Sequence, residues 1–146
     1  MGWVDSLHGS TVGLDTGPLI YYIEEHPTYL ARVKPFFEAA DRSEFRIVTS
    51  LVTLIEVLVQ PLRTGRVDLA QEYRSILLGS PSLAAIPLDE GIAEEAARLR
   101  AQYNMRTPDA IHLATAIRSG ASWFLTNDAG LPSVPGISIL MLDRLP

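Results

Sequence analysis

The sequence MRTPDAIHLATA occupies residues 105–116 and has the pattern of a helix start. Thr107 can cap the helix, and Pro108 suits the first helical position, where its missing N–H costs nothing. Asp109 then falls in the first turn, where free N–H groups and the helix dipole favour a negative charge. Apolar residues recur at helical spacing, at Ala110, Ile111, Ala114 and Ile117. Taken alone, Asp109 is explained as an acid that stabilises the first turn of this helix.

Length and composition indicate one globular domain. The chain has 146 residues, of which 47% are hydrophobic and 20% charged, so it can form a sizeable core. We expect a single domain over residues 1–146, with residues 1–10 as an N-terminal extension. The absence of cysteine excludes disulfides, zinc–thiolate sites and cysteine nucleophiles. Because the sequence shows neither a membrane-length apolar run nor a secretory signal, the expected location is the cytoplasm.

The net charge of −5 argues against a general basic surface for nucleic acid. It does not exclude an enzyme that acts on nucleic acid, because carboxylates that hold metal ions contribute to the same imbalance. The position of the acidic residues therefore matters more than their number.

Five short apolar segments alternate with helical segments along the chain. Strands that alternate with helices form a parallel sheet covered on both faces, so the sequence predicts a three-layer α/β protein. Ligand sites in such sheets form at the carboxyl ends of the strands. The expected strands cover residues 10–15, 45–49, 83–86, 122–126 and 137–142.

Glu56 interrupts an expected helix over residues 51–59 that is apolar almost all round and therefore reads as buried. Pro61 should kink or end this helix. A buried carboxylate normally pairs with a cation or binds a metal ion. For Glu56 an ion pair with an arginine and a metal site both remain open, and we favour the metal site.

Asp15 and Asp128 follow the first and fourth expected strands. Each has an ordinary structural explanation, as a cap or a turn residue. Together with Glu56 and Asp109, however, they place four acids at the expected rim of a parallel sheet. Carboxylate oxygens suit Mg²⁺, and Mg²⁺ can assist phosphodiester hydrolysis.

Four segments, in order, resemble the successive motifs of PIN domains, most closely the VapC-type toxins of toxin–antitoxin pairs. The resemblance extends from Thr11 to Leu142. Each motif alone is weak, whereas the ordered set is specific. The segments are LDTGPLI at 14–20, LIEVL at 54–58, TPDAIHLA at 107–114 and LTND at 125–128.

The resemblance implies a PIN-like α/β/α sandwich and a Mg²⁺-dependent endoribonuclease, with Mn²⁺ as a possible substitute. Asp15, Glu56, Asp109 and Asp128 would form the acidic catalytic site. Asp15, Asp109 and Asp128 would bind metal, and Glu56 would hold a second ion or orient the attacking water. The positions expected to support these acids by hydrogen bonds are Thr16, Thr126 and Asn127.

His112 lies three residues after Asp109 and shares its side of the helix. We favour packing or a supporting hydrogen bond for His112 over a role as catalytic base. The resemblance also implies an RNA substrate, a cognate antitoxin protein and a homodimer, with the helices around Phe36 and Leu69 as the expected dimer contact.

Other functions fit the sequence less well or remain open. A phosphoacceptor receiver domain needs a late lysine, and none follows Lys34; an aspartyl-nucleophile phosphatase needs an acid where Gly17 stands. A non-toxin PIN nuclease and a catalytically silent PIN-like binding module stay open as alternatives.

Overall fold

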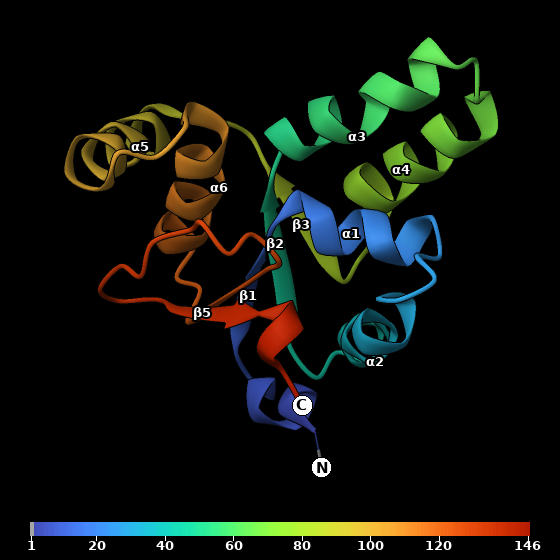
Figure 1. Cartoon of the computed structure of the whole chain (residues 1–146), viewed down its shortest axis with the longest axis horizontal. Coiled ribbons are helices and arrows are strands. Elements are labelled where there is room, and N and C mark those ends of the chain that lie inside the picture. The colour runs from blue at the N-terminus through green and yellow to red at the C-terminus, as the bar shows by residue number, and fades with distance from the viewer. Residues whose placement is uncertain (1) are drawn as a thin grey trace.

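The centre of the molecule is a parallel β-sheet. The computed structural model describes residues 2–146; Met1, part of the expected N-terminal extension, lies outside them. Within that range the strands are β1 (Thr11–Leu14), β2 (Arg46–Ser50), β3 (Leu83–Ile86), β4 (Trp123–Thr126) and β5 (Ser138–Met141). They pair in the order β3-β2-β1-β4-β5, all parallel (Figure 1). The expected parallel sheet is confirmed.

Helices cover both faces of this sheet. On one face lie α1 (Thr16–Ile23), α2 (Leu30–Asp41), α3 (Val52–Arg63) and α4 (Val67–Gly79), and on the other α5 (Glu90–Tyr103) and α6 (Thr107–Arg118) (Figure 1). Successive strand residues point to opposite faces, so Ile47 joins the core under α1–α4 and Val48 the core under α5 and α6. The three-layer α/β/α arrangement is therefore confirmed.

Gly13 in β1 allows α6 to pack closely against the sheet. A Cβ atom at position 13 would lie 2.5 Å from Cβ of Ala116 and 2.8 Å from the ring of Phe124. Both distances are shorter than van der Waals contact, so a larger residue would force the helix away. The close approach brings α6 beside the end of β1, where Asp15 follows.

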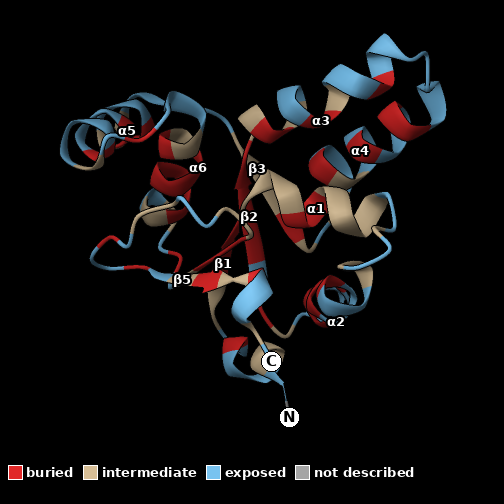
Figure 2. Ribbon diagram, in the orientation of Figure 1, coloured by how far each residue is buried: buried red, intermediate tan, exposed pale blue. Residues whose placement is uncertain are grey.

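Helix α3 bears on two sequence-based expectations. Pro61, expected to kink or end the helix, does not end it: the helix continues to Arg63 with Pro61 buried inside it. The helix is also not buried all round: Ile55, Val59 and Leu62 are 66%, 39% and 67% exposed. Figures 1 and 2 show why: α3 and α4 extend together beyond the sheet, so only one side of α3 meets the core.

Two further expectations concern helix caps and the dimer contact. Asp89 caps α5, accepting a hydrogen bond from the Ile92 N–H at 2.8 Å. Thr107, by contrast, is the first residue of α6, and Arg106 holds the N-cap position. Phe36 and Leu69 are core residues, 0% and 6% exposed, so a dimer contact through the helices around them would use the exposed faces of α2 and α4.

The N-terminal residues pack on the body of the protein. Trp3–Leu7 forms a 3-10 helix, Leu7 is fully buried, and Trp3 stacks on Phe36. No helix in residues 2–146 combines the length and the apolar character that crossing a membrane requires.

Candidate active site

Asp15 stands where β1 ends and α1 begins. Its carboxylate accepts the Thr16 N–H at 2.8 Å on Oδ1, which caps α1. Its other oxygen accepts the Thr126 hydroxyl at 2.7 Å. Thr126 ends the neighbouring strand β4, so the two strand ends jointly fix this side chain.

The environment of Asp15 disfavours its negative charge. Burial raises the pKa of Asp15, and the nearby Asp109 charge raises it further, against the opposing effects of Thr126, His112 and Thr16. Within residues 2–146 no arginine or lysine forms an ion pair with Asp15. A half-buried carboxylate of this kind is stabilised when a cation reaches it.

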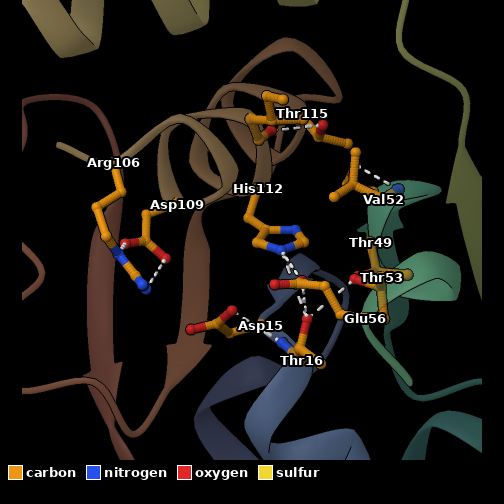
Figure 3. A network of polar contacts seen from close by, with 12 residues as sticks. Asp15, Thr16, Thr49, Val52, Thr53, Glu56, Arg106, Asp109, His112 and Thr115 are labelled. Atoms are coloured by element: carbon orange, nitrogen blue, oxygen red, sulfur yellow. Dashed lines mark hydrogen bonds and ion pairs between the residues drawn. The ribbon is translucent and has the colours of Figure 1, made fainter. Parts of the chain in front are cut away.

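Glu56 on α3 bonds to α6 and α1. Its Oε1 lies 2.6 Å from Nε2 of His112 and accepts the Thr16 hydroxyl at 2.7 Å (Figure 3). The hydrogen bond from His112 is the largest cause that lowers the pKa of Glu56, so the side chain is a carboxylate. Of the described residues it is a histidine and not an arginine that pairs with Glu56, whose side chain is 36% exposed.

The contacts of His112 fix its tautomer. The ring is buried, at 3% exposure, and its Nδ1 has no hydrogen-bond partner among the described residues. Because a carboxylate only accepts, Nε2 must carry the proton that is donated to Glu56. Nδ1 has no partner in either protonation state of the ring, so Nε2 carries the polar contacts of this side chain among the described residues. The expected supporting hydrogen bond from His112 is present.

Two buried threonines that the sequence analysis did not identify continue this network. Thr53 lies 3.4 Å from the Thr16 hydroxyl and 3.1 Å from the Thr49 hydroxyl, and Thr49 donates to the Leu14 carbonyl at 2.8 Å. These contacts join α3 and β2 to the end of β1. The available signal was the spacing of Thr53 and Glu56, three residues apart and hence on one side of the helix.

Asp109 opens α6 and pairs with an arginine from its own helix start. Arg106 donates from Nε to Oδ2 at 2.9 Å and from Nη2 to Oδ1 at 3.4 Å (Figure 3). The arginine side chain is 78% exposed and that of Asp109 18%. The hydrogen bond to Asp109 raises the pKa of Arg106, and the charges of Asp128 and Glu56 add to the effect. Three of the four acids, Asp109, Asp128 and Glu56, therefore raise the pKa of one exposed arginine.

Asp128 begins the loop after β4. Its N–H donates to the Thr126 hydroxyl at 3.0 Å, and its Oδ1 accepts the Gly130 N–H at 2.9 Å. Thr126 thus contacts both Asp15 and Asp128. Asn127 bonds elsewhere: its amide donates to the Tyr21 hydroxyl at 3.3 Å and accepts the Asp143 N–H at 3.1 Å.

The side chains fit a divalent metal ion in chemistry but are not yet arranged around one. Over residues 2–146, no three His, Asp or Glu side chains are grouped closely enough to hold a metal ion. The donor set is nevertheless all carboxylate oxygen, as hard divalent cations require. Asp15 has no ion-pair partner among the described residues, and the cation paired with Asp109 is an arginine whose side chain is 78% exposed. The site therefore suits a metal ion once Arg106 shares or leaves Asp109.

Comparison with known proteins agrees with this geometry. The PIN domain family matches residues 12–137 of the sequence, which is most of the chain. The chain belongs to the PIN domain family. No curated protein matches it significantly.

Solved structures with the same PIN fold come from several bacteria. A toxin–antitoxin complex from Klebsiella pneumoniae is 26% identical, with a TM-score of 0.66 over 91% of this chain and 98% of that one. VapBC2 from Rickettsia felis, bound to a promoter DNA fragment, is 18% identical, with a TM-score of 0.69 over 89% and 97%. Mycobacterium tuberculosis VapC20, described as a toxin that cleaves the sarcin–ricin loop, is 16% identical, with a TM-score of 0.63 over 79% and 87%.

Proposed function

We propose that this PIN domain is a Mg²⁺-dependent endoribonuclease that hydrolyses RNA phosphodiester bonds and is the toxin of a toxin–antitoxin pair. The observation that carries the proposal is the half-buried Asp15 carboxylate, without a cation, beside Asp109 and Asp128 at the carboxyl edge of the sheet. Family membership and the toxin–antitoxin neighbours support it. We further propose that the protein acts in the cytoplasm.

Asp15, Asp109 and Asp128 are the residues that would hold the ion. When bound, Mg²⁺, or Mn²⁺ in its place, supplies charge stabilisation at the phosphate and lowers the pKa of water. The Thr126 hydroxyl donates to Asp15 and accepts a hydrogen bond from the Asp128 N–H. It therefore holds these two proposed metal ligands relative to each other. Glu56, which bonds to His112 and Thr16, would hold a second ion or orient the attacking water.

The test is cleavage of single-stranded RNA by the purified protein. We expect cleavage with Mg²⁺ or Mn²⁺, loss on addition of EDTA, and loss in Asp15→Asn. Asp68→Asn is the matched control, because this acid is exposed on α4, far from the site in sequence and outside its hydrogen-bond network. Cleavage that survives EDTA, or persists in Asp15→Asn, would contradict the proposal.

The proposal includes a cognate antitoxin, which the toxin–antitoxin neighbours support. Ile55, Val59 and Leu62 form an exposed apolar row on α3, at positions i, i+4 and i+7. An apolar antitoxin segment covering this row would lie next to Glu56. A homodimer through the helices around Phe36 and Leu69 would use the exposed faces of α2 and α4.

A further inference from the structure

A pocket of about 310 Å³ opens beside the acidic site. Its walls are the end of α5 and the link to α6, the first turn of α6, and the loop after β4. Asp109 and Asp128 line it directly, so the pocket and the proposed metal ligands share a boundary. The other lining residues used below are Tyr103, Asn104, Arg106 and Leu131.

The pocket is preformed. Met105, at its base, is buried in the core under α5 and α6, and Leu131 packs against the same core. Arg100 donates from Nε to the Met105 carbonyl at 2.9 Å, which fixes the link between the helices. Asn104 ends α5 in a left-handed conformation, with φ of 55°. These contacts hold the walls in place without a ligand.

The polar groups of the pocket are available for binding. The exposed Asn104 amide has no hydrogen-bond partner among residues 2–146, so its donor and acceptor are both free. Arg106 uses Nε and Nη2 on Asp109, and Nη1 has no partner in the described structure. An arginine beside an otherwise acidic site provides charge for one phosphate.

We propose that this pocket binds the nucleotide next to the scissile phosphate of the RNA substrate, an inference that rests on the proposed function. Arg106 contacts its phosphate, Asn104 reads a base edge, and the Tyr103 ring packs on the base. Unpaired bases are recognised in this way, by stacking and by hydrogen bonds to their edges. A volume of about 310 Å³ is at the lower end of small-ligand pockets and suits one nucleotide rather than a duplex.

The experiment separates binding from cleavage. Fluorescently labelled single-stranded RNA, 12 nucleotides long with randomised sequence, is titrated into Asp15→Asn, which binds without cutting. When Arg106→Gln is introduced into the Asp15→Asn variant, RNA binding should weaken about tenfold, the effect of losing one charged hydrogen bond. Arg63→Gln is the matched control, because this arginine ends α3 outside the pocket.

In the otherwise native protein, Asn104→Gly removes the amide and keeps the left-handed backbone. It should change the base preferred beside the cleavage site when fragments of a random RNA pool are sequenced. Unchanged affinity in Arg106→Gln together with unchanged cleavage sites in Asn104→Gly would overturn the subsite. If the native protein does not cut RNA but Arg106→Gln still weakens binding, the nuclease proposal fails and the pocket stands as an RNA-binding site.

Discussion

At the scale of single residues, Asp15 costs stability when no metal ion is present. Asp15→Asn keeps a good helix cap and removes the buried charge, so we expect the thermal midpoint at pH 7 to rise by about 3 °C. Mg²⁺ should raise the midpoint of the native protein and leave that of Asp15→Asn unchanged. Thermal denaturation with and without Mg²⁺ checks both. Equal stabilisation of the two proteins by Mg²⁺ would place the ion elsewhere.

The pH dependence of this difference has a defined sign. The folded-state pKa of Asp15 is raised, so the native protein loses stability relative to Asp15→Asn as pH rises from the unfolded value of about 4. The gap between the two midpoints should therefore be largest near pH 7 and close below pH 4. Glu56 has a lowered pKa and acts in the opposite sense, but it is present in both proteins and cancels. Midpoints measured from pH 3.5 to 7.5 without metal test this; a gap that widens on acidification would contradict it.

His112 positions Glu56 rather than reacting itself. His112→Ala should lower kcat by about 10- to 100-fold, the usual cost of losing a residue that orients a catalytic group. His112→Gln should recover part of the activity, because its amide can donate to the Glu56 carboxylate. Leu113→Ala removes a neighbouring core side chain without touching Glu56, so its kcat per folded molecule should stay near native. Equal kcat in His112→Ala and Leu113→Ala would assign His112 to packing alone.

At the scale of elements, the position of α6 against β1 determines where Asp109 lies. Gly13→Ala would place a methyl group against Ala116 and Phe124, and we expect it to destabilise the fold by about 2–3 kcal/mol. Chemical denaturation measures this. Gly79→Ala, at the end of α4 with open space around its Cβ, should be neutral or slightly stabilising. A Gly13→Ala variant of native stability would mean that α6 can shift without cost.

The proposed antitoxin contact on the exposed row of α3 predicts an effect on binding without an effect on folding. Leu62→Glu should leave the thermal midpoint within about 2 °C of native, because Leu62 is 67% exposed, yet weaken antitoxin binding at least about tenfold. Co-purification with the proposed antitoxin provides the measurement. Leu88→Glu is the control, an apolar residue 51% exposed just before α5, on the other side of the sheet. If only Leu88→Glu weakens the complex, the antitoxin occupies the other face.

At the scale of the whole molecule, a net charge of −5 leaves little attraction for RNA beyond local arginines. Single-stranded RNA binding to Asp15→Asn should therefore depend weakly on salt, with a slope of log affinity against log salt of about −1, as for one or two phosphate contacts. Titrations between 50 and 300 mM KCl give the slope. A slope near −5 would reveal a basic RNA path that the pocket at Arg106 does not explain.

The failures of sequence reasoning have physical causes that can be named. Periodicity reports which residues share a side of a helix, but not what stands opposite that side. The apolar pattern therefore predicted a buried helix α3. In the structure Ile55 and Leu62 face solvent, because α3 and α4 extend past the sheet. Likewise, nothing in the local pattern indicated that Glu56 would find His112, 56 positions away, as its partner.

The sequence by itself determined the class of fold, because strand and helix periods and their alternation are local properties that the backbone obeys. It also identified the acids, since a carboxylate at a strand end or in an apolar helix is visible without coordinates. Only the tertiary structure decided how those acids are arranged: Asp15 without a cation, Asp109 on Arg106, Glu56 on His112 and Thr16. Burial and pairing are relations between distant segments, and the packing of α6 against β1 and α3 sets them.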